Sequence, residues 1–268
     1  MPDKLYTTLP GRILLRLLTT PAISKMAGSF MNSYLSKFII EPFIKKNSID
    51  MSDYKIENWK CFNHFFTRNL RPGKRPVDMN PISLISPCDG YLTAYNISPD
   101  SSFEIKNTSY SLGELLHNPS LASEYEGGLC LVFRLTPSDY HRYIYPDTGA
   151  KLKNISIPGV FHTVRPIAFE KYPVFKTNSR EYTILGTNNF DDVVFMEVGA
   201  MLVGKIVNHH QEYTFTRGEE KGMFEFGGST IIMLIKKDIA LIDTEIKSAS
   251  NRGEEYKVKM GESIGVRI

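Results

Sequence analysis

The sequence predicts an α+β protein in which amphipathic N-terminal helices precede a β-rich catalytic body of mostly antiparallel short strands. Apolar residues before residue 80 recur at helical spacing, whereas later ones fall in short runs broken by Gly, Pro, Asn and Asp. These runs lack the regular intervening helices of a doubly wound sheet. With 268 residues, 42% of them hydrophobic, the chain is long enough to bury a substantial core.

The first 46 residues are basic and amphipathic. They carry seven Lys or Arg against two Asp or Glu, a net charge of +5, so the other 222 residues sum to −2 within the total of +3. Ile13, Leu14 and Leu17 share one helical face, and residues 30–38 repeat that spacing, which predicts two helices split near Pro21. Two interpretations stay open: helices packed on the protein's own core, or helices lying on an anionic membrane surface.

A helix with an aromatic face is expected over residues 53–70. Ile56, Trp59, Phe62 and Phe66 recur there at helical spacing, a pattern typical of a buried face, and the loop RPGKRPVD follows. Four basic residues of this region are expected in a solvated loop rather than in contact with lipid phosphate: Arg68, Arg71, Lys74 and Arg75.

Short β-type runs fill the chain beyond residue 80, and only SLGELLHNPS (111–120) looks helical there. The predicted strands lie in the runs LISPCDGYLTAYNI, GLCLVFRL, YIYP, KNISIPG, EYTIL, DVVFMEVGAMLVGKIV, EYTFT and STIIMLI. The longest uninterrupted apolar runs, 129–133 and 231–235, have five residues each. They are too short to span a bilayer.

Composition disfavours several classes of function. The three cysteines, Cys61, Cys88 and Cys130, are far apart, which argues against a disulfide framework or a Cys-x-x-Cys metal site and fits a reducing compartment. A net charge of +3, without aromatic residues inside basic clusters, argues against nucleic acid as a partner. We therefore expect no metal and no nucleic acid.

Three short segments carry residues suited to chemistry. Asp89 stands in the turn SPCDG, His141 in SDYHRY after an apolar run, and Ser229 in FGGST directly before the run IIMLI. Each has an ordinary structural interpretation as well: Asp-Gly is common turn chemistry, a lone histidine is usually structural, and two glycines indicate a bulge or turn. No segment is decisive by itself.

The order of these segments along the chain resembles the phosphatidylserine decarboxylase family, a group of self-processing enzymes of phospholipid synthesis. The resemblance covers nearly the whole chain, in family order, through FNHFFTRNLRPGKRPVD, SPCDG, YSLGELL, SDYHRY, IPGVFHTVRPIA, VGAMLVGKI, RGEEKGMFEFGGST and KMGESIG. One short match would carry little weight. Eight blocks in the same order identify the chain as a member.

The resemblance implies that the chain makes its own cofactor. The Ser229 hydroxyl would attack the Gly228 carbonyl to give an ester, and elimination would release residues 1–228 as the β chain. The α chain, residues 229–268, would then begin with a pyruvoyl group derived from Ser229. Its ketone would take the amine of phosphatidylserine as a Schiff base, so that loss of CO₂ yields phosphatidylethanolamine. Glycines suit this step because they permit close approach and strained backbone geometry.

Asp89 and His141 acquire roles from the same resemblance. Serine needs a base, and an imidazole oriented by a carboxylate is a recurrent one. Many family members carry a second histidine three residues after the first, where this chain has Ile144. Either His141 serves both self-cleavage and decarboxylation, or another group such as His162 substitutes, or maturation is slow or lost. We expect Asp89 to orient His141.

We expect the chain to have two parts: a membrane-associating helical segment, 1–50, and a decarboxylase catalytic domain, 51–268. Expected partners are a phospholipid substrate, an anionic membrane surface and the two fragments of the precursor, with a homodimer as a further assembly. The expected location is peripheral, on the cytoplasmic face of the cell membrane. Two alternatives stay open: a pyruvoyl decarboxylase of another amino compound, and a non-catalytic membrane-binding relative.

Overall fold

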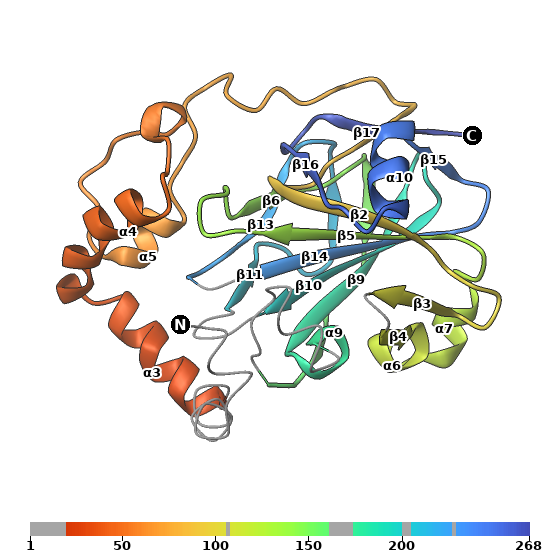
Figure 1. Ribbon diagram of the computed structural model, residues 1–268, viewed down its shortest axis with the longest axis horizontal. Helices are drawn as coiled ribbons and strands as arrows, with labels where there is room; N and C mark the ends of the chain where they lie inside the picture. Colours follow the sequence, from red (N-terminus) through yellow and green to blue (C-terminus); the bar gives the residue numbers. More distant parts are fainter. Residues whose placement is uncertain (1–19, 106–107, 161–173, 200–204, 227–228) are drawn as a thin grey trace.

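The computed structural model describes residues 20–105, 108–160, 174–199, 205–226 and 229–268, and it confirms the α+β class. Helices near the N-terminus lie on one side of a large antiparallel sheet, and smaller sheets and short helices cover that sheet (Figure 1). The predicted helix over residues 13–18 lies outside the described residues. The division of the chain at residue 50 stays a prediction.

The helices are short, and in the sequence they occur before the first strand and between later strands. They are α3 (Pro21–Met31), η1 (Tyr34–Ile39), α4 (Ile40–Lys46), η2 (Met51–Asp53), α5 (Phe62–Phe66), α6 (Leu112–Leu116), α7 (Pro119–Ser123), α9 (Val174–Thr177) and α10 (Thr244–Asn251). Helix α3 begins at Pro21 as expected, because the ring of proline fixes φ near helical values and the first turn needs no N–H from it.

The strands fall into one large sheet and three small ones. They are β1 (Ser83–Ile85), β2 (Gly90–Asn96), β3 (Ser102–Ile105), β4 (Thr108–Ser111), β5 (Leu129–Leu135), β6 (Arg142–Ile144), β7 (Gly149–Lys151), β8 (Ile155–Ile157), β9 (Arg180–Thr187), β10 (Asp192–Gly199), β11 (Ile206–Asn208), β12 (Tyr213–Phe215), β13 (Glu220–Phe224), β14 (Ser229–Ile235), β15 (Ala240–Ile242), β16 (Tyr256–Val258) and β17 (Ser263–Arg267).

The large sheet has nine strands in the order β12-β7-β9-β10-β14-β5-β2-β16, with β8 also paired to β9, and its strand pairs are antiparallel. The small sheets are β1-β17-β15, β11-β13-β6 and β3-β4. Strand β14 lies between β10 and β5, and all seven of its residues are buried. The uninterrupted apolar run after Ser229 is therefore the signature of a strand covered on both faces.

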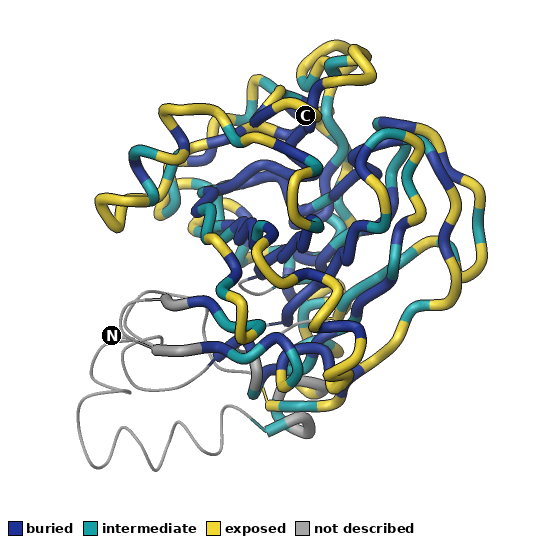
Figure 2. Tube along the Cα trace, turned by 90° about the vertical axis from the view of Figure 1, so that its right-hand side faces the viewer, coloured by how far each residue is buried: buried dark blue, intermediate teal, exposed yellow. Residues whose placement is uncertain are grey.

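Two apolar cores lie on opposite faces of this sheet. Alternate residues of β14 divide between them. Ile232 belongs to the core beneath α6, α7, α9 and the β3-β4 sheet, and Ile231 belongs to the core beneath the sheets β1-β17-β15 and β11-β13-β6. Figure 2 shows the buried strands at the centre of the molecule, with exposed segments around them. The position of Ser229 is thus fixed by the packing on both faces of the strand that it begins.

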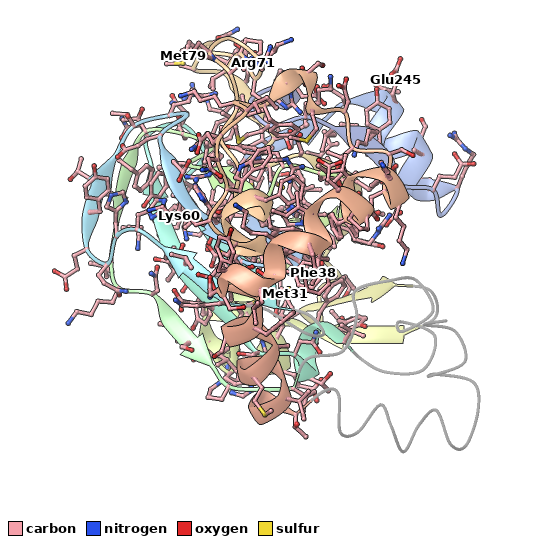
Figure 3. All side chains as sticks on the ribbon, turned by 90° about the vertical axis from the view of Figure 1, so that its left-hand side faces the viewer. Met31, Phe38, Lys60, Arg71, Met79 and Glu245 are labelled. Atoms are coloured by element: carbon pink, nitrogen blue, oxygen red, sulfur yellow. The ribbon has the colours of Figure 1, made fainter. Side chains whose placement is uncertain are left out.

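The N-terminal helical segment divides its apolar residues between two environments. Ile40 is buried and Phe43 is partly buried in a third core, where they meet the aromatic residues of α5 and Ile144 of β6. Phe38 and Leu35 stay about 70% exposed, at 71% and 69%. Figure 3 faces this side of the molecule, with Phe38 labelled on the helices. No helix among the described residues is long and apolar enough to cross a membrane.

One predicted helix was wrong in length, and one prediction about the number of later helices was wrong. The helix expected over 53–70 is only α5, since the flanking residues pair with each other: Arg71 N donates to Asp53 O at 2.9 Å, and Lys55 N to Asn69 O at 2.9 Å. Tertiary pairing overrides the helical spacing there. SLGELLHNPS forms α6 and α7 as expected, but it is not the only helix beyond residue 80, because α9 and α10 also form.

Candidate active site

Ser229 begins the central strand. It pairs with Gly199 of β10 on one side and Leu135 of β5 on the other, and its side chain is 1% exposed. Its Oγ has no hydrogen-bond partner among the described residues. Buried hydroxyls nearly always have a partner, so an orphaned one marks a candidate reactive group. Gly227 and Gly228 lie outside the described residues.

His141 lies directly before β6 and is fully buried. Its Nδ1 is 2.9 Å from the carbonyl oxygen of Asp139. A carbonyl only accepts hydrogen bonds, so Nδ1 carries the proton and Nε2 presents a lone pair. That Nε2 is buried, and it too lacks a partner in the described part of the chain. The ring of Phe66 packs on the imidazole with 4.1 Å between centroids.

The surroundings of His141 keep it neutral. Burial lowers the pKa of His141 well below its usual value, and the positive charge of Arg68 lowers this pKa further. Arg68 is itself buried, and its guanidinium donates to the carbonyls of Ser138 and Asp139 at 3.3 Å each. A neutral imidazole with a free Nε2 is the protonation state that a general base requires near neutral pH.

The loop that holds His141 is fixed by Asp139. Its carboxylate accepts hydrogen bonds from Thr136 N at 2.6 Å and Thr136 Oγ1 at 2.7 Å, and it pairs with Lys257. Burial opposes the charged form, but the hydrogen bonds from Lys257 and Thr136 outweigh it and lower the pKa of Asp139. Asp139 thereby sets the direction of its own carbonyl, which determines the tautomer of His141.

Asp89 lies in a different polar cluster from His141. Its carboxylate accepts from Arg75 Nε at 2.8 Å, Arg75 Nη2 at 2.6 Å and Met260 N at 2.9 Å. The next residue, Gly90, begins β2 where a Cβ would come within 2.9 Å of Arg134 O, so glycine lets β2 approach β5. No hydrogen bond joins Asp89 to His141 in the described structure. Direct orientation of His141 by Asp89 stays a prediction.

The segment just before Ser229 is held by aromatic packing. The ring of Phe226 packs edge-on against Phe62 at 4.8 Å, Phe66 at 5.3 Å and Phe43 at 5.9 Å between centroids. Phe226 N also donates to Asn63 Oδ1 at 3.0 Å. Helix α5 therefore contacts the residue three positions before Ser229 and, through Phe66, the ring of His141.

Ile144 occupies an apolar environment. It is 3% exposed and belongs to the core that contains Phe62, Phe65 and Tyr140. This side chain transfers no proton, so the second family histidine has no equivalent at its own position. His162, the other group considered from the sequence, lies outside the described residues.

The sequence missed several residues that contribute to this site. Arg68 and Arg75 were expected in a solvated loop, but the side chain of Arg68 is buried and that of Arg75 is 8% exposed, because each is tied to the site's own polar groups. Asp139 lies two residues before His141 in SDYHRY, so the motif contained it without showing its role. Asn63 carried no local signal, since its contact with Phe226 joins positions 163 residues apart.

Comparison with known proteins shows the family to which the chain is similar. The family model described as phosphatidylserine decarboxylase matches residues 62–266. A relative from Clostridium acetobutylicum, named phosphatidylserine decarboxylase proenzyme 2, is 46% identical over 262 residues, which cover 97% of this chain and 90% of the relative. Relatives named phosphatidylserine decarboxylase proenzyme are 47% identical in Clostridium botulinum strain 657, over 91% of this chain and 84% of the relative, and 43% in Ruminiclostridium cellulolyticum, over 98% and 90%.

A buried serine that begins a central strand and a buried, neutral histidine fit the class of self-processing enzymes. The family model covers most of the chain, and the relatives are more than 40% identical to it. The chain therefore belongs to the phosphatidylserine decarboxylase family.

Proposed function

We propose that the chain is a proenzyme that cleaves itself between Gly228 and Ser229 and then converts phosphatidylserine to phosphatidylethanolamine and CO₂. The observation that carries the proposal is the orphaned Oγ of Ser229, fully desolvated at the first residue of β14. The family supplies the substrate class, because its relatives are named for phosphatidylserine decarboxylation.

The residues present fit the pyruvoyl group that this function requires. Ser229 supplies its carbon atoms, and the two glycines before it carry no side chains that would hinder attack on the scissile carbonyl. When formed, the group supplies a ketone that acts as an electron sink during loss of CO₂. Among the described residues, no cluster of three or more His, Cys, Asp or Glu is arranged to hold a metal ion.

His141 is proposed as the base of the first step. Its Nε2 takes the proton of the Ser229 hydroxyl, while the oxygen forms a bond to the Gly228 carbonyl carbon. The proton then passes to the amine nitrogen of Ser229 as the C–N bond breaks. Asp139 keeps Nδ1 protonated, and packing against Phe66 keeps water away from the imidazole. With Ile144 in place of the second histidine, His141 serves both self-cleavage and decarboxylation.

The two fragments are expected to stay together after cleavage. Strand β14 would belong to the α chain, yet it is paired on both sides with β10 and β5 of the β chain. Lys257 and Met260 of the α chain contact Asp139 and Asp89 of the β chain. Separation would expose the buried faces of β14, so the mature enzyme is an αβ unit. A homodimer of such units stays a prediction.

Intact mass tests this function. The purified protein should give fragments of 228 and 40 residues under denaturing conditions, since 268 − 228 = 40. The smaller fragment should carry a pyruvoyl group, with ammonia lost and water gained overall. Ser229→Ala, which has no oxygen to attack, should stay one chain, whereas Ser229→Cys retains a nucleophile and should cleave.

Two outcomes would contradict the proposal. A wild-type protein that remains a single chain of 268 residues would support the non-catalytic alternative. A cleaved protein that releases no CO₂ from phosphatidylserine, but releases it from another amino compound, would support the other alternative. Labelled substrates presented in detergent micelles distinguish these cases.

We further propose that the N-terminal segment lies on the anionic cytoplasmic face of the cell membrane. The net charge of +5 over residues 1–46 accompanies exposed apolar side chains: Met26, Phe30, Tyr34, Leu35 and Phe38. The rings of Phe30 and Phe38 lie together, 6.5 Å between centroids. Basic residues near anionic headgroups with apolar rings in the acyl boundary define an interfacial helix.

Vesicle binding tests the membrane proposal. Phe30→Ser combined with Phe38→Ser should lower binding to phosphatidylglycerol vesicles at least about tenfold, because each ring buried in the interface contributes more than about 1 kcal/mol. A matched control replaces Leu152 and Ile155, also exposed, with serine and should leave binding unchanged. Equal loss in both double variants would show general rather than segment-specific adsorption.

A further inference from the structure

Lys257 of β16 contacts the loop that carries His141. Its ammonium group pairs with the carboxylate of Asp139, 118 positions away in the sequence. The side chain of Lys257 is 47% exposed, whereas that of Asp139 is only 5% exposed. A pair between two exposed groups would contribute little, but a buried carboxylate without a partner bears a large desolvation cost. The charged state of Asp139 therefore depends on Lys257.

The position of Lys257 is fixed by the main sheet. In the pairing of β16 with β2, Lys257 lies opposite Tyr91, and in the pairing of β2 with β5, Tyr91 lies opposite Arg134. Side chains directly opposite each other on paired strands lie on the same face of a sheet. The Lys257 ammonium is 4.4 Å from the centre of the Tyr91 ring, and the Arg134 guanidinium is 4.9 Å from it. This row of three side chains holds Lys257 beside Asp139.

Asp139 connects Lys257 to His141 through its own backbone. Its carboxylate accepts hydrogen bonds from Lys257 and from two atoms of Thr136, and its carbonyl accepts the hydrogen bond of His141 Nδ1. The carboxylate and the carbonyl belong to one residue, so the donors that hold the carboxylate also limit rotation of the carbonyl. The orientation of the imidazole thus depends on a lysine that follows Ser229 in the sequence.

The other charged or titratable groups around Asp139 do not replace Lys257. Arg68 donates to the carbonyl of Asp139 rather than to its carboxylate. Arg134 is already paired with another carboxylate. Burial raises the pKa of the Cys88 thiol well above its usual value, so this group is uncharged near neutral pH. In the part of the chain that the structure describes, Lys257 is thus the cation that pairs with this carboxylate.

We propose that Lys257 is a positioning residue for His141: by holding the Asp139 carboxylate, it keeps the Asp139 carbonyl directed at Nδ1 and leaves Nε2 free to accept a proton. The inference rests on the proposed function, in which His141 is the base. The α chain would then supply two things to the mature enzyme, the ketone derived from Ser229 and the cation that orients a base in the β chain.

Lys257→Met tests the inference in the mature enzyme. Burial alone raises the pKa of Asp139, and the hydrogen bond and charge of Lys257 help to bring it below its usual value. Without Lys257 this pKa rises, and a protonated Asp139 holds the loop less firmly. The acid limb of kcat for decarboxylation should therefore move up by at least about one pH unit. Each protein completes self-cleavage at pH 8, and kcat is then measured from pH 4 to pH 8 on the same phosphatidylserine micelles.

Two matched variants separate positioning from the loss of a surface charge. Lys257→Arg keeps a cation at this place on β16 and should retain the wild-type pH profile. Lys259→Met removes the same charge two residues farther along, from an exposed lysine that forms no ion pair among the described residues. This control should also keep the wild-type profile.

NMR on the Ser229→Ala precursor gives a readout that needs no activity, in case Lys257→Met cleaves poorly. The carboxyl carbon of Asp139, assigned by its loss in Asp139→Asn, should titrate at least about one pH unit higher in Lys257→Met. The ring ¹⁵N shifts of His141 report which nitrogen carries the proton. The Nδ1–H tautomer should persist from pH 8 to pH 5 in the parent, and in Lys257→Met it should decline as Asp139 takes up its proton.

Failure of the inference is distinguishable from failure of the proposed function. If wild type neither cleaves nor decarboxylates, the proposed function fails. If wild type is active and Lys257→Met keeps its pH profile, or loses the same fraction of kcat at every pH, then Lys257 does not position His141 and the proposed function still stands. An unchanged His141 tautomer during titration of Asp139 would overturn the inference as well, as would an equal shift of the acid limb in Lys259→Met.

Discussion

The central strand β14 and the helical segment at residues 21–46 place their apolar side chains in opposite environments. Every residue from Ser229 to Ile235 is buried, between two paired strands and two cores. In the helical segment only Ser36 and Ile40 are buried among the side chains that the structure describes, while Tyr34 is 74% exposed. The strand has its partners within the chain, whereas Leu35 and Phe38 of the helical segment stay exposed in the part of the chain that the structure describes.

The difference in burial between β14 and the helical segment suits two different tasks. The reactive serine needs a fixed position, because attack on a neighbouring carbonyl depends on alignment within a fraction of an ångström. A strand buried on both faces supplies that rigidity. The helical segment instead presents rings and basic residues at the surface, which suits a fluid partner such as a lipid headgroup layer. Phe43 links the two regions, since it packs on Phe226.

Truncation of one side chain in each region tests whether the two environments differ in stability. Ile232→Ala in β14 should lower the free energy of unfolding by about 2–5 kcal/mol, because it leaves a cavity beneath α6 and α9. Leu35→Ala, at 69% exposure, should change it by less than about 0.5 kcal/mol. Urea denaturation in a Ser229→Ala background keeps both precursors uncleaved. Equal losses would mean that the helices also form a rigid core.

A smaller effect concerns the pH dependence of stability. His141 has a lowered pKa in the folded chain, whereas unfolding returns it to about 6.5. Below about pH 6.5 the unfolded state therefore binds one more proton, and the free energy of unfolding falls by about 1.4 kcal/mol for each unit of acidification. The slope ends at the lower, folded-state pKa.

The matched variant for this prediction is His141→Gln, again with Ser229→Ala. It should lose this part of the acid slope between pH 6.5 and 5, so the difference in unfolding free energy between the two proteins should shrink as the pH falls. Parallel slopes would show that His141 is protonated in the folded chain, and would remove its neutral Nε2 as the base.

Candidate site residues could be named from the sequence where motif order carries information. Ser229, His141 and Asp89 could be named because each stands in a family block, and blocks keep their order whatever the tertiary contacts. The contacts themselves were not predictable. The pairing of Asp89 with Arg75 depends on the fold of the loop that carries Arg75, and the sequence does not indicate which acidic residue that arginine will meet.

The helix expected over residues 53–70 also shows that tertiary contacts were not predictable from the sequence. Apolar spacing at 53–70 indicated one long helix, but the bridge between Tyr54 and Leu70 closes that segment into a loop with only five helical residues. Helical spacing reports which side chains share a face, and a loop that buries the same aromatic residues satisfies it equally well. For β14 no such ambiguity existed, since an apolar run of strand length after two glycines suits a doubly covered strand.

The sequence by itself determined the α+β class, the family and the serine at which the chain is expected to be cut, because these depend on residue types in order. Only the tertiary structure decided which polar atoms are left without partners. Ser229 Oγ, His141 Nε2 and Asn63 Nδ2 come from β14, the residue before β6, and α5. Their burial and unsatisfied bonds arise from packing between distant segments, and local sequence patterns do not record such contacts.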